Sequence, residues 1–169
     1  MSLVAFKARN HPQQAVRDDV DDRRTPDELF ADLHQEFGFT LDAAASAENA
    51  KLPHYFDLER DGLASSWKGE RVWCNPPYSR VAPWVAKAWH EMENGCELVV
   101  MLLPANRTEQ RFWQEHVEPF RDGGRARSPR GGGIALQTRF VARRIRFQYP
   151  PDQPQKDRPK NGSVLLIWT

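Results

Sequence analysis

In the sequence Val72-Trp73-Cys74-Asn75-Pro76-Pro77-Tyr78, a short apolar run leads directly into a rigid polar corner. The apolar run predicts a buried strand, and the tetrapeptide begins where that strand ends. In open α/β sheets, ligands bind at the carboxyl ends of the strands. The two prolines fix φ and remove two backbone donors, which gives the carbonyl groups of the corner a set direction. We therefore expect a binding site at this strand end.

The side chains of the tetrapeptide indicate a nucleobase as the ligand. Asn75 adds a neutral amide oxygen as an acceptor, and Tyr78 adds a flat aromatic face. Such a pair suits an exocyclic amino group, which donates two hydrogen bonds while its ring stacks on the tyrosine. The alternative is a simple turn, because Asn-Pro often starts turns, but a turn has no need of the tyrosine. We predict that the catalytic residues are Asn75, Pro76, Pro77 and Tyr78.

The segments on both sides predict an α/β sandwich. Thr25-Pro26 has the pattern of an N-cap followed by proline at the first helical position, and Gly38 ends that helix. The segment from 43 to 71 is too short for several helix–strand units, so part of the sheet must be abbreviated. The other expected elements are strands at 39–42, 72–74 and 98–103, a helix with its apolar stripe at Val81, Trp84, Val85, Ala88, Trp89 and Met92, a helix at 108–117, and a terminal strand pair at 145–149 and 164–168.

The composition of the 169-residue chain suits one domain. Residues 1–24 are polar and predict a flexible tail, so the domain is expected at 25–169. No apolar stretch is long enough to span a bilayer, and the charged N-terminus lacks a signal-peptide pattern. Cys74 and Cys96 cannot make a disulfide framework, which favours the cytoplasm. No metal site is expected, because the histidines are widely spaced and no cysteines are paired.

The charge is distributed unevenly along the chain. Residues 1–104 hold 11 Lys/Arg and 17 Asp/Glu, a net charge of −6, whereas residues 105–169 hold 13 and 6, a net charge of +7. Eight arginines and one acid lie between 121 and 146, which indicates an encounter with a polyanion. A basic Arg/Gly loop at 121–139 is the expected contact. A solvated loop remains the alternative, as does a structural role for Arg143, Arg144 and Arg146.

The motifs together resemble a known family. The tetrapeptide after an apolar strand resembles the catalytic motif of S-adenosylmethionine-dependent amino methyltransferases that act on DNA. The wider stretch from 25 to about 113 resembles the small phage-encoded DNA N6-adenine methyltransferases. The matching segments are Thr25-Pro26, Leu29-Phe30, Leu41-Asp42-Ala43-Ala44-Ala45, Asn49-Ala50-Lys51, Asp61-Gly62-Leu63, Trp67, Asn75-Pro76-Pro77-Tyr78, Trp84-Val85-Ala86-Lys87-Ala88 and Leu102-Leu103-Pro104-Ala105.

The resemblance implies a class I methyltransferase fold and S-adenosylmethionine as the cofactor. Thr25 and Pro26 correspond to contacts with the methionine end of the cofactor, and Asp61 to a contact with its adenine amino group. We expect the strand end at Asp42, Ala43 and Ala44 to lie beside the methyl donor, and Asn75 to lie beside it as well. Methyltransferases of this type usually carry glycines at that strand end, whereas this chain has alanines. Each residue also has a structural alternative: a helix cap at Thr25, a helix start at Asp42 and a turn at Asp61. For the ribose, Asp57 and Glu59 are candidates only by position.

The resemblance further implies methyl transfer to the N6 amino group of an adenine that is flipped out of double-stranded DNA. The expected phosphate contacts are Arg125, Arg127, Arg130 and Arg139. A bacterial or phage-infected cell is the expected setting. N4-cytosine methylation, glutamine methylation in a protein, and a catalytically silent DNA-binding protein with the same fold remain alternatives, of which the basic loop disfavours the protein substrate.

Overall fold

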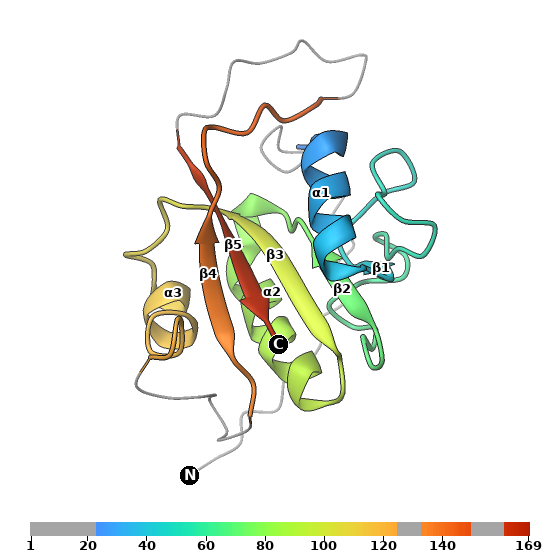
Figure 1. Ribbon diagram of the computed structural model, residues 1–169. Coiled ribbons are helices and arrows are strands. Elements are labelled where there is room, and N and C mark those ends of the chain that lie inside the picture. Colours follow the sequence, from blue (N-terminus) through green and yellow to red (C-terminus); the bar gives the residue numbers. More distant parts are fainter. Residues whose placement is uncertain (1–22, 125–132, 150–160) are drawn as a thin grey trace.

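The computed structural model describes residues 23–124, 133–149 and 161–169. In this part of the chain, five strands form one sheet in the order β1-β2-β3-β5-β4 (Figure 1). The strands are β1 (Leu41–Asp42), β2 (Arg71–Cys74), β3 (Leu98–Pro104), β4 (Leu136–Phe140) and β5 (Ser163–Trp168).

The sheet is mixed, and its parallel half positions the site. Strands β1, β2 and β3 are parallel, whereas β5 runs antiparallel between β3 and β4. Because parallel strands end at the same edge, the tetrapeptide after β2 lies beside the residues that follow β1. The arrangement is that of an abbreviated class I methyltransferase-like fold with a terminal antiparallel pair, which confirms the predicted fold class.

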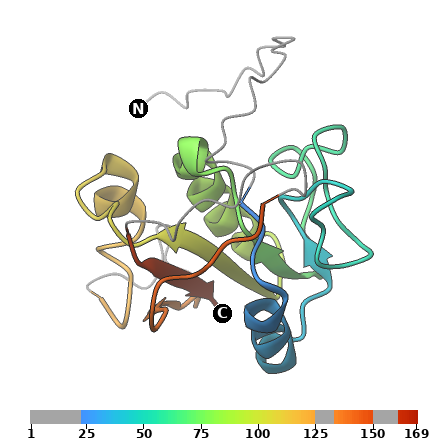
Figure 2. The ribbon, with the colours of Figure 1, turned by 90° about the horizontal axis from the view of Figure 1, so that it is seen from above.

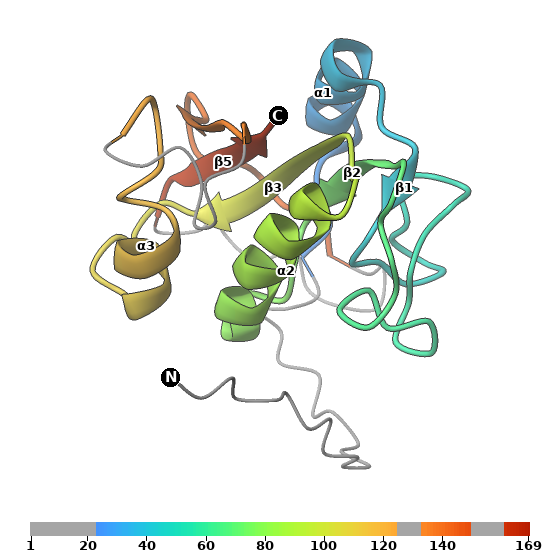
Figure 3. The same cartoon turned by 90° about the horizontal axis from the view of Figure 1, so that it is seen from below.

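Helices cover both faces of the sheet (Figures 2 and 3). Helix α1 (Asp27–Phe37) lies on one face, and α2 (Val81–Glu93) and α3 (Arg111–His116) lie on the other. A single 3₁₀ turn, η1 (Tyr78–Arg80), joins the tetrapeptide to α2. The site is therefore built where a buried strand passes through one rigid turn into a helix.

The predicted core stripe of α2 is confirmed. All six of its apolar residues are buried, and Trp89 meets Trp168 of β5 edge to face with a centroid distance of 6.0 Å. Strand β3 is buried along its whole length, as expected for a central strand covered on both faces. Burial of these side chains fixes α2, and through η1 it fixes the position of Tyr78.

The start of α1 differs from the prediction. The helix begins at Asp27 with Pro26 as its N-cap, and the Thr25 side chain does not cap it, so the predicted N-cap was one residue too early. The C-terminal end agrees with the prediction. Gly38 has a φ of 61° and donates its N–H to the His34 carbonyl, as a helix-ending glycine does.

The predicted strand at 145–149 is wrong. The partner of β5 is 136–140, and within 145–149 the structure has one isolated bridge, between Gln148 and Arg24. The alternation that suggested a strand is real, because Ile145, Phe147 and Tyr149 are buried and the intervening side chains are exposed. Those apolar side chains pack on the core without joining the sheet. The true strand gave little signal because only Leu136 among its five residues is buried.

Other boundaries shift by a few residues. The first strand is limited to 41–42, and the helix expected at 108–117 covers 111–116. Residues 43–70 contain no named helix or strand, in agreement with the expected abbreviation. The last part of the expected 121–139 loop belongs to β4, and the expected 1–24 tail lies almost wholly outside the described residues. No described helix is long and apolar enough to cross a membrane.

The segment from 57 to 67 is held against α2 by buried contacts. The Trp67 indole N–H donates to the Gly62 carbonyl at 2.9 Å, and the Trp67 backbone N–H donates to the Glu91 carboxylate at 2.7 Å. Glu91 also pairs with Lys87 at 2.6 Å. Burial opposes the charge of Glu91, but the hydrogen bonds from Lys87 and Trp67 outweigh it and lower its pKa. These family-motif residues therefore have a packing role.

Gly62 is the tightest point of this contact and gives a first prediction. A Cβ there would lie 2.1 Å from the Ala43 carbonyl oxygen, which is a backbone atom that cannot move aside. We expect Gly62→Ala to lower the free energy of unfolding by roughly 2–3 kcal/mol, the usual cost of overpacking. Urea titration at pH 7.5 measures this cost. The control is Gly133→Ala, where nothing lies within 4 Å of the added carbon; equal effects of the two changes would contradict the packing argument.

Candidate active site

The site begins with the pairing of β1 and β2. Asp42 is in register with Trp73, and the Ala43 N–H donates to the Trp73 carbonyl at 2.9 Å. Asp42 and Asn75 therefore follow two adjacent strands at one edge of the sheet. Figure 1 shows the start of α1 and the segment before residue 150 at the end of the sheet where β3 finishes.

Asn75 and Tyr78 carry unsatisfied polar atoms. The Asn75 side-chain amide donates to the Arg23 carbonyl at 3.0 Å, but its Oδ1 is buried and has no partner among the described residues. Tyr78 is 4% exposed, and its hydroxyl likewise has no partner in the described part of the chain. Burial raises the pKa of Tyr78, although the nearby Arg23 charge opposes this, so the phenol is neutral at physiological pH. Within the described residues, the corner thus offers one unpaired acceptor and one neutral hydroxyl.

Asp42 is a buried carboxyl group at the end of β1. Its Oδ2 accepts the Lys51 backbone N–H at 3.0 Å, whereas Oδ1 is buried without a hydrogen-bond partner in the described regions. Burial raises the pKa of Asp42 to about 6, and hydrogen bonds from the backbone N–H groups of Lys51 and Ala44, together with the Lys51 ammonium group, oppose that rise. The backbone N–H of Lys51 therefore holds the Asp42 side chain in place at the end of β1.

The remaining predicted cofactor residues divide into two groups. Thr25 is 2% exposed, and its buried hydroxyl has no partner in the parts of the chain that the structure describes. Ala43 is buried, and Pro26 and Ala44 are half-buried. Asp61 differs: it is exposed at a φ of 42° and its carboxylate accepts the Leu63 N–H at 3.0 Å. That geometry is the turn that the sequence offered as an alternative.

Neither acid that was considered for the ribose stands out. The Asp57 carboxylate accepts the backbone N–H groups of Glu59 and Arg60, which holds it in a local turn. Glu59 is exposed. The packing of Gly62 on Ala43 nevertheless brings the 57–63 segment next to the end of β1. The structure therefore gathers these sequence motifs at one edge, even where individual carboxylates serve turns.

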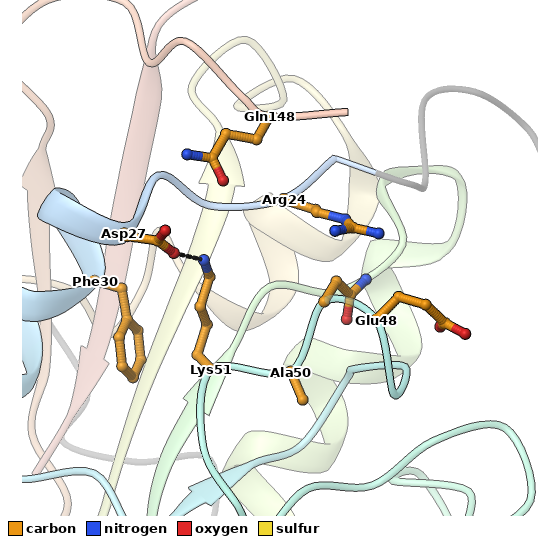
Figure 4. Close-up of a pocket in the computed structure, with 8 residues that line it drawn as sticks. Arg24, Asp27, Phe30, Glu48, Ala50, Lys51 and Gln148 are labelled. Atoms are coloured by element: carbon orange, nitrogen blue, oxygen red, sulfur yellow. Dashed lines mark hydrogen bonds and ion pairs between the residues drawn. The ribbon is translucent and has the colours of Figure 1, made fainter. Parts of the chain in front are cut away.

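A pocket of about 310 Å³ opens beside this edge (Figure 4). Arg24 and Gln148 lie on one side of it, and Lys51 and Ala50 on the other. Lys51 forms an ion pair with Asp27 at 2.5 Å. None of the predicted cofactor residues lines the pocket, but several are sequence neighbours of those that do. Its lining residues are Arg24, Asp27, Phe30, Glu48, Asn49, Ala50, Lys51 and Gln148.

Two residues that sequence reasoning missed cover the tetrapeptide. The Arg23 guanidinium carbon lies 5.8 Å from the Tyr78 ring centroid and 5.7 Å from that of Phe147. The two rings meet edge to face at 6.2 Å. The alternating apolar pattern around Phe147 was visible in the sequence but was assigned to the sheet, whereas no sequence signal singled out Arg23.

Of the four arginines predicted to contact DNA, Arg139 alone lies in the described regions. Its guanidinium forms two hydrogen bonds of 2.7 Å with Glu36 and lies 5.4 Å from the Phe37 ring centroid. This fork-to-fork pair ties β4 to α1. Arg125, Arg127 and Arg130 lie outside the described residues. Among the described residues, no cluster of three potential metal ligands is present.

The fold and this strand-end site together define a methyltransferase-like protein. The sequence profile of the DNA N-6-adenine-methyltransferase (Dam) family matches residues 12–126. The chain therefore belongs to this family.

Individual relatives agree with this assignment. The DNA N-6-adenine-methyltransferase of Escherichia phage T1 is 40% identical over 109 residues, which cover 63% of this chain and 44% of that protein. The enzyme of the same name from Haemophilus phage HP1 is 33% identical over 83 residues, or 49% of this chain and 48% of that protein. YfdM of Escherichia coli K12 is 36% identical over 84 residues, 45% of this chain and 87% of YfdM. The matches thus span about half the length of the two phage proteins.

The raised pKa of Asp42 gives a second prediction. Between the ordinary pKa of 3.8 and about 6, the folded chain holds a proton that the unfolded chain has lost, so stability falls as pH rises through this window. Asp42→Asn removes this dependence. We expect the free energy of unfolding of the variant, relative to the wild type, to increase by roughly 2 kcal/mol between pH 4.5 and pH 7.5. Urea titrations at the two pH values give this difference.

The control for this comparison is Asp32→Asn, which changes an exposed acid on α1. Its effect on stability should be the same at both pH values. A pH-independent effect of Asp42→Asn would show that the buried carboxyl group titrates normally.

Proposed function

We propose that this protein transfers a methyl group from S-adenosylmethionine to the N6 amino group of an adenine in DNA. Family membership supports the reaction class, and the curated phage relatives carry this activity in their names. The observation that carries the proposal is the buried Oδ1 of Asn75, which has no hydrogen-bond partner among the described residues and belongs to the same corner as Tyr78. An acceptor that is left unsatisfied costs free energy unless a ligand pairs with it, and the exocyclic amine of a base is such a ligand.

The corner residues account for the activation of a poor nucleophile. The lone pair of an aromatic amine is delocalised into the ring, which makes the nitrogen unreactive. Acceptors at Asn75 Oδ1 and at the Pro76 carbonyl would bind both amino protons and favour a tetrahedral nitrogen. They would also stabilise the positive charge that develops on that nitrogen. The Tyr78 ring would hold the base by stacking, and Pro76 and Pro77 keep the acceptors rigid.

The residues near the pocket fit the cofactor. S-adenosylmethionine carries an ammonium, a carboxylate and hydroxyl groups, and when bound it supplies the electrophilic methyl carbon on its sulfonium. Buried oxygens without partners in the described residues, Asp42 Oδ1 and Thr25 Oγ1, match its donor groups, and Lys51 matches its carboxylate. The pocket volume is at the lower end of the range for small-molecule sites. Asp42, with a pKa of about 6, would bind a cation best above that pH.

The base must leave the duplex to reach this corner, because the N6 nitrogen is inaccessible inside the helix. The proposed site therefore acts on a flipped adenine in double-stranded DNA, and the basic segment after residue 121 would supply phosphate contacts. Within that segment, Arg139 is already paired with Glu36. The proposal for backbone contact consequently rests mainly on Arg125, Arg127 and Arg130.

The central test is methylation of DNA by the Asn75→Ala variant. Unmethylated genomic DNA is incubated with labelled S-adenosylmethionine and digested to nucleosides, and the methylated nucleoside is identified by mass spectrometry. We expect N6-methyladenine with the wild type and a loss of about 10²–10³-fold in rate with Asn75→Ala, the typical effect of removing a transition-state hydrogen bond.

The matched control is Asn94→Ala at the far end of α2, where the side-chain amide donates to the His90 carbonyl at 2.6 Å and lies 3.4 Å from the His90 ring nitrogens. That variant should keep the wild-type rate. Methyl label on cytosine N4 would overturn the base assignment, and a full rate with Asn75→Ala would overturn the role of the corner.

The arginine segment gives a further prediction. Arg127→Ala and Arg130→Ala should each weaken DNA binding and reduce the slope of log K against log[salt] by about one, since each removes one phosphate contact. Fluorescence anisotropy between 50 and 250 mM salt measures the slope, and calorimetry should show unchanged cofactor affinity. Arg111→Ala on α3 removes an equal charge elsewhere and should leave the slope unchanged. Equal loss of DNA and cofactor binding would indicate a structural role.

A further inference from the structure

The aromatic site beside Asn75 is occupied by the protein's own chain. Arg23 holds its guanidinium within 6 Å of both the Tyr78 and the Phe147 ring centroids. A planar cation at this distance is attracted to both rings. Tyr78 and Phe147 are consequently 4% and 6% exposed. In this arrangement no base can stack on Tyr78 unless the arginine moves.

The same residue also engages the polar half of the site. The Arg23 carbonyl accepts the Asn75 side-chain N–H at 3.0 Å. One residue thus places a flat, delocalised group on the tyrosine and a hydrogen-bonding group on the asparagine. A flipped base would use the same two side chains, but it would donate to the Asn75 oxygen, which this contact leaves unpaired within the described residues.

A short strap holds Arg23 in place. Arg24 and Gln148 exchange two backbone hydrogen bonds, of 2.9 and 3.0 Å, and form an isolated antiparallel bridge. The strap consists of 23–25 and 145–149. It is anchored by Ile145, Phe147 and Tyr149, which are buried, whereas Gln148 is exposed. One two-bond bridge outside the sheet is weaker than a strand within it, so the strap can open while the sheet stays intact.

The closed arrangement satisfies its polar atoms poorly. In the described regions, Arg23 Nε, Asn75 Oδ1 and the Tyr78 hydroxyl are all buried without a hydrogen-bond partner. Each such group has a desolvation cost that pairing would remove. The arginine therefore fills the space of a ligand without making its hydrogen bonds, which favours exchange for a ligand that does.

We propose that Arg23 is a gate, which occupies the base-binding site in the free protein and leaves it when DNA presents a flipped base. The gate rests on the proposed function of that site. Arg146 in the strap and Arg143 and Arg144 just before it are exposed, and none of the three forms an ion pair with another described residue. A DNA phosphate at the mouth of the site attracts these cations and the displaced Arg23. Backbone contact and opening of the strap are thereby coupled, and the site stays closed to free nucleotides.

The first test removes the Arg23 side chain and measures how well a base analogue binds to the site. The probe is 2-aminopurine deoxyriboside, whose fluorescence is quenched when it stacks on tyrosine. We expect Arg23→Ala to bind the probe roughly 2- to 30-fold more tightly than the wild type, because a cation–π contact no longer has to be displaced. Arg111→Ala, which removes an equal charge on α3, should match the wild type. Unchanged or weaker binding by Arg23→Ala, or no binding by either protein, would overturn the gate.

The second test locks the strap. Arg24 and Gln148 form a hydrogen-bonded antiparallel pair, whose Cα separation of about 5.5 Å is within disulfide range. In the Arg24→Cys/Gln148→Cys variant, oxidation should lower the rate of DNA methylation at least about tenfold, and dithiothreitol should restore it. Each single cysteine variant controls for oxidation elsewhere. Full activity in the oxidised form, or no recovery on reduction, would contradict the gate.

The two tests separate this inference from the proposed function. If the wild type transfers no methyl group to DNA but Arg23→Ala binds the probe more tightly, the proposed reaction is refuted and the gate is not. If the wild type methylates adenine and the oxidised Arg24→Cys/Gln148→Cys variant keeps the full rate, only the gate is refuted.

Discussion

The parallel pairing of β1 with β2 holds the candidate site together. Two residues of β1 in register with β2 are enough to bring Asp42 and the Asn75 corner to one edge. The pairing is so short that it needs support from both sides. Phe30 and Phe39 pack against Trp73 on the α1 side, and the 57–67 segment packs against Ala43. The geometry of the site therefore depends on this packing.

The motifs shared with the family serve the site in two different ways. Some, such as Asn75 and Asp42, have buried oxygens without a hydrogen-bond partner in the described part of the chain, and these are the atoms that we propose bind ligand. Others hold the frame: Trp67 and Lys87 converge on Glu91, and the absence of a side chain at Gly62 allows contact with the backbone of β1. A sequence pattern cannot separate these roles, because both restrict residue type. Hydrogen-bond partners and burial separate them.

The sequence predicted the helices and central strands well, because each has a strong apolar pattern. It failed at the sheet edge, where 136–140 buries one side chain and 145–149 buries three. The apolar alternation at 145–149 correctly indicated buried side chains but not a strand of the sheet, because this segment packs on the core and its backbone pairs only with Arg24 among the described residues. Because 145–149 was assigned to the sheet, the contact of Phe147 with Tyr78 was not predicted. Likewise, the sequence grouped Arg139 with the arginines expected to contact phosphate, whereas in the structure its guanidinium is paired with Glu36.

The sequence by itself determined the α/β class, the strand-end corner at 75–78 and the family, because rigid prolines, an apolar strand and ordered motifs are local properties. Tertiary packing alone decides which carboxylates are buried and which are held in turns, and it alone brings the Arg23 guanidinium within 6 Å of the Tyr78 and Phe147 ring centroids. Those residues are separated by more than fifty positions, and no periodicity records their contact. Their arrangement follows from the bridge between Arg24 and Gln148, which brings 23–25 and 145–149 together.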